Sequence, residues 1–342
     1  MTRNRLRFAI LAACALLLAL PSVSKASVMD EVIGRGHVRC GVHTGIQGFA
    51  VKDANGKWNG LNADFCRAVA AAVLSDASKV EFFPVSVKDG LDMLREGKVD
   101  LLARNLTQTL TRDTDAGFSF VGINYYDGQG ILARRQLGAS NIRSLNNVAV
   151  CVQPASTSER NLEDFMQSLR VPYRKVTVAN AQEMLKAYQE RRCDAMTTDY
   201  TQLAILRQTQ LPDPDEHVLF RERLSKEPLG PLVRKGDEGW YKIVKWTLLA
   251  QIAAEELGIT KANIQDMKKS PQSAVRRFLG VDPGLGKALG LGESWAYEII
   301  RQTGNYGESF ERHLGSASPI GLERGLNDLW TKGGLMYAPP FQ

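Results

Sequence analysis

The chain of 342 residues carries 43 Lys and Arg against 37 Asp and Glu, which gives a net charge of +6 at neutral pH. Four of the basic residues and none of the acidic ones lie within residues 1–26, so about +2 remains for the rest of the chain. The rest of the chain, residues 27–342, contains no polybasic run and no apolar stretch of membrane-spanning length. The composition therefore excludes a nucleic-acid-binding protein of the basic-patch type and an integral membrane protein.

The first 26 residues have the anatomy of a secretory signal peptide. Three arginines precede an apolar run over residues 8–20, and small residues then lead to Ala26. The apolar run is too short to span a bilayer. Residues 11–14 spell an acylation box, but too little of the run precedes Cys14 for a lipoprotein signal. We therefore predict cleavage after Ala26 and export to the periplasm.

The next hundred residues show an α/β pattern. The expected elements are, in order, strand 37–42, helix 64–74, strand 80–85, helix 88–96 and strand 99–103. This order predicts a largely parallel sheet with helices on its faces. Ligands of such sheets bind beyond the carboxyl ends of the strands, where the loop 41–49 would lie. Phe49 is then a candidate aromatic wall for a ligand, and the alternative is an ordinary core phenylalanine.

Residues 104–114, RNLTQTLTRDT, follow the last of these strands and offer groups that suit a carboxylate. Arg112 can supply a planar, bidentate cation, while Asn105 and Thr107 supply an amide and a hydroxyl. The alternative is a polar turn with an exposed arginine, and the segment alone does not decide between the two.

A second α/β pattern follows, with strand 148–153, helix 157–169, strand 174–178, helix 181–191, strand 194–198, helix 200–209 and strand 217–220. Ser156 and Thr157 open a helix directly after a strand, where hydroxyls and free N–H groups suit an anion. Both are also ordinary capping residues. Asp199 ends a strand at the same edge of the sheet and could meet an ammonium group, or it could cap the helix that follows.

Two segments connect the patterns. Residues 131–135 read as a strand that leaves the first lobe, and residues 227–235 lead back to it, which together would form a hinge. The long helix 239–257 and further helical pieces follow. The expected division is a first lobe over 27–133, a second lobe over 134–229, and 230–342 for the return strand and a C-terminal helical extension.

Four cysteines remain after the signal peptide, which in an oxidising compartment favours disulfides. Three pairings are possible. Neighbourhood in the chain favours Cys40 with Cys66 and Cys151 with Cys193, and free buried thiols are the alternative. A metal site is not expected, because there is no C-x-x-C motif and the four histidines are scattered.

Common catalytic and cofactor motifs are missing from the sequence. It contains no P-loop, no G-x-S-x-G and no HExxH, and its Gly-x-Gly pairs lack the context of a dinucleotide fingerprint. No cofactor is expected. The chain offers instead a guanidinium in one lobe and a carboxylate in the other, which complement the two charges of an α-amino acid.

The chain resembles the periplasmic solute-binding proteins of amino-acid ABC transporters, in the general, broad-specificity L-amino-acid-binding branch. The resemblance covers essentially the whole chain after the signal peptide. It rests on collinear segments that include GLNADFCRAVAAAV at 60–73, RNLTQTLTRDT at 104–114, YYDGQG at 125–130, RRCDAMTTD at 191–199 and SKEPLGPLVR at 225–234. It implies the two-lobed type II (Venus-flytrap) periplasmic-binding-protein fold, with a mostly parallel sheet in each lobe.

The resemblance also implies roles for residues. Arg112 would clamp the α-carboxylate of an L-amino acid and Asp199 would take its ammonium, with Thr107, Asn105, Ser156 and Thr157 around them. The chain departs from the family pattern at Ala155, where a glycine is expected, and at Leu106 and Gln108. The implied partner is an inner-membrane ABC permease, and the implied oligomeric state is a monomer. The alternative function is an enzyme on the same fold, a periplasmic cyclohexadienyl dehydratase.

Overall fold

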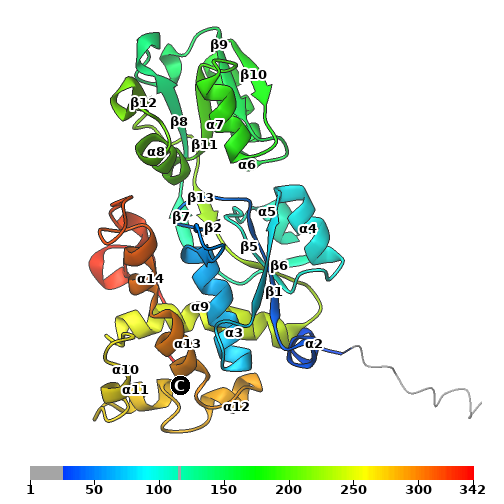
Figure 1. The fold of residues 1–342 in the computed structure, drawn as a ribbon, viewed down its shortest axis with the longest axis vertical. Helices are drawn as coiled ribbons and strands as arrows, with labels where there is room; N and C mark the ends of the chain where they lie inside the picture. Colours follow the sequence, from blue (N-terminus) through cyan, green and yellow to red (C-terminus); the bar gives the residue numbers. More distant parts are fainter. Residues whose placement is uncertain (1–25, 115–116) are drawn as a thin grey trace, which may run out of the picture.

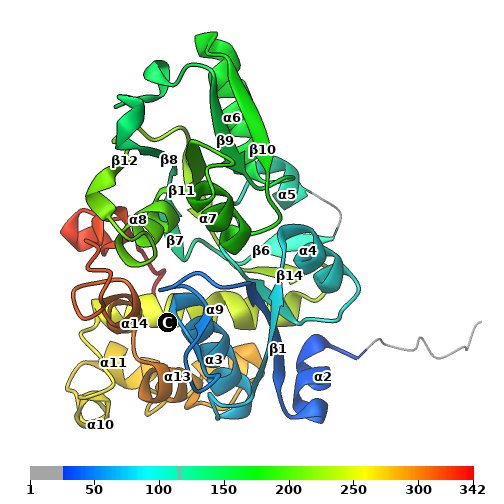
Figure 2. The same ribbon diagram turned by 45° about the horizontal axis from the view of Figure 1, so that its top comes forward.

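The computed structural model describes residues 26–114 and 117–342 (Figure 1). The predicted signal peptide therefore lies, except for Ala26, outside the described residues. Two lobes are visible in Figures 1 and 2, each built around its own sheet. Among the residues that the structure describes, no helix has the length and apolar character needed to cross a membrane.

The sheet of the first lobe has the strand order β4-β1-β5-β14-β6. Its strands are β1 (Val38–His43), β4 (Val80–Val85), β5 (Leu101–Ala103), β6 (Phe118–Phe120) and β14 (Leu232–Arg234). β1 pairs in parallel with β4 and β5, and β14 runs antiparallel to both of its neighbours. Four of the five strands therefore point the same way, and their carboxyl ends meet at one edge.

The sheet of the second lobe repeats this arrangement in the order β10-β9-β11-β8-β12. Its strands are β8 (Gln129–Arg134), β9 (Val148–Val152), β10 (Tyr173–Thr177), β11 (Ala195–Asp199) and β12 (His217–Leu219). Here β8 is the reversed strand, antiparallel to β11 and β12. Each lobe thus has the mostly parallel sheet that the sequence predicts, with one strand reversed.

The connection between the lobes differs from the expected one. β7 (Tyr125–Asp127) and β13 (Glu227–Leu229) form a two-stranded antiparallel sheet between the lobes (Figure 1). β8, which was expected to leave the first lobe, is instead a full member of the second sheet. The chain therefore crosses earlier than residue 133, because strand membership is decided by long-range pairing and not by the local pattern.

Helices cover both sheets. The first lobe carries α2 (Val28–Arg35), α3 (Leu61–Leu74), α4 (Val87–Arg95), α5 (Leu110–Thr114) and α9 (Glu238–Glu256), and the second carries α6 (Thr157–Leu169), α7 (Ala181–Gln189) and α8 (Tyr200–Thr209). Short pieces complete these lobes, namely β2 (Val51–Lys52), β3 (Trp58–Asn59) and the 3-10 turns Arg135–Leu137, Ile142–Ser144 and Pro214–Glu216. Two hydrophobic clusters in the second lobe each contain different residues of β8, β9 and β11. Helices therefore pack on both faces of this sheet.

α3 begins three residues before the predicted start. Gly60 precedes it with φ +127°, and a Cβ at this position would lie 2.3 Å from the carbonyl carbon and oxygen of Phe49. Only glycine permits this close approach of two backbone segments. The helix therefore starts directly after Gly60, where helical spacing of apolar residues gave no signal.

Disulfides join Cys40 to Cys66 and Cys151 to Cys193, the pairing expected from their neighbourhood in the chain. The first bond ties β1 to α3, and the second ties β9 to the segment between α7 and β11. Each bond closes a loop within one lobe, so neither restricts the position of one lobe relative to the other.

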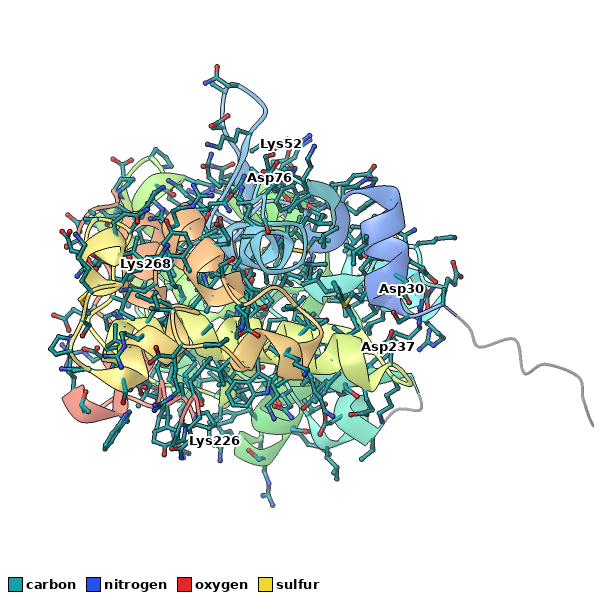
Figure 3. All side chains as sticks on the ribbon, turned by 90° about the horizontal axis from the view of Figure 1, so that it is seen from below. Asp30, Lys52, Asp76, Lys226, Asp237 and Lys268 are labelled. Carbon is teal, nitrogen blue, oxygen red and sulfur yellow. A yellow bond between two sulfur atoms is a disulfide. The ribbon has the colours of Figure 1, made fainter. Side chains whose placement is uncertain are left out.

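The C-terminal extension packs on the first lobe. It contains α10 (Ile264–Met267), α11 (Ser273–Phe278), α12 (Leu285–Leu289), α13 (Trp295–Thr303), α14 (Tyr306–His313) and the 3-10 turns Gly325–Asn327 and Trp330–Lys332. α13 lies beside α3, and α9 crosses the underside of the lobe with Asp237 at its start (Figures 1 and 3). Asp237 caps α9 through the N–H of Trp240 and also accepts the N–H of Val28, 2.7 Å away.

A buried carboxylate anchors this extension. Asp64, at the start of α3, accepts hydrogen bonds from Ser309, Arg312 and His313. Burial alone would raise the pKa of Asp64, but the hydrogen bonds and charges of His313 and Arg312 outweigh it and hold the pKa well below its ordinary value. The ionised carboxylate therefore stabilises the docked extension.

Candidate functional site

A polar cleft lies where the carboxyl ends of the two sheets face each other. It encloses about 400 Å³ of space that is partly open to solvent. Its lining comprises His43, Ile46, Val87, Arg104, Asn105, Leu106, Thr107, Arg112, Gln153, Ser156, Thr157, Ser158, Thr198, Asp199 and Gln202. Six of the seven predicted ligand contacts are in this set, and they come from both lobes.

Arg112 reaches the cleft from α5. Its Nη1 donates to the carbonyl oxygen of Thr107 at 2.9 Å, which fixes the plane of the guanidinium. Burial and the nearby charge of Arg160 lower the pKa of Arg112, while the charges of Glu227 and Asp199 act in the opposite direction. No other hydrogen bond joins the guanidinium to the described residues, so its remaining N–H groups are available to an anion.

Asn105 and Thr107 line the same wall but are partly engaged already. Asn105 has φ +57°, a left-handed conformation that asparagine tolerates, and its Oδ1 accepts from Asn62 Nδ2 at 2.5 Å. Thr107 Oγ1 donates to Glu227 and lies 3.3 Å from Thr157 Oγ1 of the other lobe. The hydroxyls of Thr107 and Thr157 therefore meet across the cleft.

Glu227, at the start of β13, is a central residue of this site that the sequence analysis missed. It is 1% exposed, and its two oxygens accept from Thr107, Thr157, Asn161 and Ser225. The Asn161 bond measures 3.0 Å and the Thr157 bond 3.1 Å. Four donors satisfy the carboxylate, so it joins residues of both lobes and is not available to a cationic ligand.

Ser156 and Thr157 begin α6. The hydroxyl of Ser156 accepts from the N–H of Glu159 at 3.1 Å and donates to the carbonyl of Gln153 at 2.7 Å, so it acts as the helix cap. The capping role that was the alternative for Ser156 is therefore present. The first N–H groups of a helix lack intrahelical acceptors, and those of Thr157 and Ser158 start at the cleft wall. This helix start suits an anion beside Arg112.

Ala155 precedes the cap in the left-handed region, with φ +58°. This conformation costs a residue with a Cβ about 1 kcal/mol. We expect Ala155→Gly to raise the free energy of unfolding by about 0.5 to 1 kcal/mol, measured as a higher urea midpoint. Ala274→Gly within α11 is the matched control, because glycine in a right-handed helix lowers stability by a similar amount. A lower midpoint for Ala155→Gly would contradict the strain argument.

Asp199 faces Arg112 from the end of β11. It occupies the capping position of α8, but its side chain makes no capping hydrogen bond and no hydrogen bond to any other described residue. Burial and the charges of Asp127 and Glu227 raise the pKa of Asp199 well above its ordinary value, although Arg104 and Arg112 oppose this. An unpaired carboxylate with a raised pKa is suited to a cationic group.

Asp127 lies behind Asp199 and was also missed. Its Oδ1 accepts the N–H of Gly128 at 2.8 Å, and both of its oxygens lie near the N–H of Thr201 at 3.3 to 3.4 Å. Burial raises the pKa of Asp127, and the charge of Asp127 in turn raises the pKa of Asp199. The two carboxylates therefore repel each other at one end of the cleft, which favours a cation there.

Phe49 does not line the cleft, and its predicted role as an aromatic wall is wrong. It is 2% exposed and packs edge-on against Tyr125, with the ring centroids 5.0 Å apart. The turn at residues 46–50 directs it into the core of the first lobe. The alternative stated above, an ordinary core phenylalanine, is the observed one.

Two further residues of the lining, Arg104 and His43, were not predicted. Arg104 directly follows β5 and His43 ends β1. Both are almost fully buried, at 4% and 3% exposure. Within residues 26–114 and 117–342 no group of His, Cys, Asp and Glu side chains has an arrangement that could hold a metal ion.

Comparisons with known proteins agree with this architecture. Residues 38–263 match the family described as bacterial extracellular solute-binding proteins, family 3. The chain is 46% identical to the general L-amino acid-binding periplasmic protein AapJ of Rhizobium johnstonii, over 99% of each chain. It is 44% identical to the glutamate/glutamine/aspartate/asparagine-binding protein BztA of Rhodobacter capsulatus, over 96% of this chain and 97% of that one.

Solved structures of binding proteins also match the chain. An ABC transporter/periplasmic binding protein from Brucella ovis with glutathione bound superimposes with a TM-score of 0.89 at 43% identity, over 92% of this chain and 99% of that chain. An ancestral amino acid-binding protein described as a precursor of cyclohexadienyl dehydratase gives a TM-score of 0.57 at 28% identity, over 68% and 95%. The relatives that match nearly the whole chain are binding proteins and not enzymes.

Proposed function

Because the chain belongs to the bacterial extracellular solute-binding proteins of family 3, we propose that it captures L-amino acids for an ABC importer. In this proposal it works in the periplasm, since its relative AapJ is named a periplasmic protein, and it delivers its ligand to an inner-membrane permease. Residues 1–26 would be removed during export. The protein would act as a monomer that needs no cofactor.

The observation that carries the proposal is the opposition of Arg112 and Asp199 across one cleft. The α-carboxylate of the ligand would bind the free N–H groups of Arg112 and the backbone N–H groups at the helix start after Ser156. Thr107 and Thr157 would line this position, since their hydroxyls donate to Glu227. The ammonium would bind Asp199, with Asp127 behind it. This assignment uses the parts common to all α-amino acids, so it supports broad specificity.

The energies of such contacts are sufficient for micromolar binding. A hydrogen bond to a charged group contributes about 1.5 to 3 kcal/mol. A micromolar dissociation constant corresponds to about 8 kcal/mol. Three or four of these bonds would therefore give micromolar affinity without strong contacts to the ligand's side chain.

The two lobes would close on the ligand about β7 and β13. We place the first lobe at residues 27–124 with 230–342 and the second lobe at 128–226, since β8 belongs to the second sheet, with β7 and β13 connecting the two. Arg112 comes from the first lobe and Asp199 from the second, so one ligand touches both only in the closed form. A ligand shifts such an equilibrium only by its greater affinity for one state, and this arrangement supplies that difference.

Thermal unfolding of residues 27–342 tests the proposal. The protein is refolded to remove carried-over ligand and is then mixed with each L-amino acid, with several D-amino acids and with glutathione. A ligand present at a thousand times its dissociation constant stabilises by about 4 kcal/mol, a clear shift of the midpoint. Shifts with many L-amino acids and not with their D-forms are expected. No shift with any amino acid would overturn the proposal.

A further inference from the structure

Arg104 is a buried cation without a partner. The residue is 4% exposed, and its side chain makes neither a hydrogen bond nor an ion pair with any residue that the structure describes. Its Nε is fully buried and lacks an acceptor. Burial and the charge of Arg112 lower the pKa of Arg104 only to about 10, so the group stays protonated at neutral pH. A buried charge is costly unless it is paired, and Arg104 lines the cleft.

His43 lies next to Arg104 and presents a second donor. β1 pairs in parallel with β5 and Val42 lies opposite Ala103, so the next residues of the two strands, His43 and Arg104, emerge together. The N–H of Gly45 donates to His43 Nδ1 at 3.2 Å. Burial and the charge of Arg104 lower the pKa of His43 well below its ordinary value, which keeps the ring neutral. Its proton therefore resides on Nε2, and no described residue accepts from that atom.

The charges of the cleft can be divided into satisfied and unsatisfied groups. Glu227 is saturated by four donors, and Asp127 is held by backbone N–H groups. Arg104, Arg112 and Asp199 remain without a charged partner in hydrogen-bonding contact. Two cations and one anion complement a ligand with two carboxylates and one ammonium.

We infer that Arg104 and His43 form a second anion subsite that binds the side-chain carboxylate of an acidic amino acid. The inference rests on the proposed function, in which Arg112 and Asp199 bind the α-carboxylate and ammonium. Glutamate or aspartate would pair the guanidinium of Arg104. An amide side chain would leave that buried charge without a counterion in hydrogen-bonding contact, so the site favours acids over the corresponding amides.

Calorimetric titration of Arg104→Gln with glutamate, glutamine, aspartate and asparagine tests the subsite. In the wild type we expect glutamate to bind at least about tenfold more tightly than glutamine. Arg104→Gln should weaken acid binding about 10- to 100-fold, the range of one charge-assisted contact, and change amide binding less than about threefold. Arg112→Gln is the matched comparison, because it should weaken acids and amides alike.

Several outcomes would overturn the inference while leaving the proposed function intact. One is equal affinity of the wild type for acids and amides, and another is an equal loss for both in Arg104→Gln. Arg104→Gln removes an unpaired buried charge, so it should fold, and retained glutamine binding would demonstrate this. Arg104→Lys is a second variant, which keeps the charge and should keep the preference for acids. Absence of all amino-acid binding in the wild type would instead overturn the proposed function.

Discussion

Arg112→Gln is expected to weaken the binding of every L-amino acid by about a hundredfold to a thousandfold. Glutamine keeps a polar side chain but lacks the charge and the planar fork that pair with a carboxylate. The remaining donors, the backbone N–H groups at the start of α6, are neutral. Since the α-carboxylate is common to all the ligands, the loss should not depend on the side chain of the amino acid. Isothermal titration with a panel of L-amino acids measures it.

The fold should survive this substitution. Arg112 lowers the pKa of Arg104, which means that the two cations repel each other, so removal of one relieves a repulsion. The thermal midpoint of the ligand-free protein should therefore not fall. Arg143→Gln, at an exposed arginine in the second lobe, is the control and should bind as the wild type does. Near-native affinity of Arg112→Gln would remove Arg112 from the site.

The affinity for amino acids is expected to fall as the pH decreases, because Asp199 must be ionised to bind an ammonium group. In the ligand-free protein the pKa of Asp199 is raised well above its ordinary value, by burial and by the charges of Asp127 and Glu227. A bound ammonium favours the ionised carboxylate and so lowers this pKa. Affinity is therefore highest above the raised pKa and falls below it, by up to about tenfold per pH unit.

Two variants separate the effects of Asp199 and Asp127 on the pH dependence of the affinity. Asp199→Asn should bind about 10- to 100-fold more weakly at neutral pH and lose most of the pH dependence. Asp127→Asn removes a like charge, so it should lower the pKa of Asp199 and move the fall in affinity to lower pH. Titration calorimetry between pH 8 and pH 5 measures both effects. A pH dependence that Asp199→Asn leaves unchanged would exclude Asp199 as the ammonium partner.

The sequence located most of the cleft because position in an α/β pattern is a strong constraint. Arg112 and Asp199 follow strands whose carboxyl ends must meet at a sheet edge, and Thr157 opens a helix there. Phe49 follows the same logic of position, but a tight turn directs its ring into the core. Direction of a side chain after a glycine-containing loop depends on backbone angles that the residue types do not specify.

The charged site residues that could not be predicted from the sequence were missed for a different reason. The segments that contain Arg104, Asp127 and Glu227 were all singled out in the sequence. What distinguishes these three residues from their neighbours in the chain is their surroundings in the folded protein. Glu227 is saturated and Arg104 is unpaired, and this difference depends on residues up to 120 positions away. The membership of β8 was missed for the same reason, since its partners β11 and β12 lie far along the chain.

The position of β14 bears on the order in which the molecule folds. β14 lies between β5 and β6 in the first sheet, although the whole second lobe separates it from them in the chain. Pairings of such large sequence separation form slowly, because a long loop must close first. The second lobe is one contiguous segment with its own core and disulfide, and its sheet contains no strand from outside that segment. The first lobe, which carries Arg112 and Arg104, can complete its sheet only when β14 is present, and β14 follows the whole second lobe in the chain.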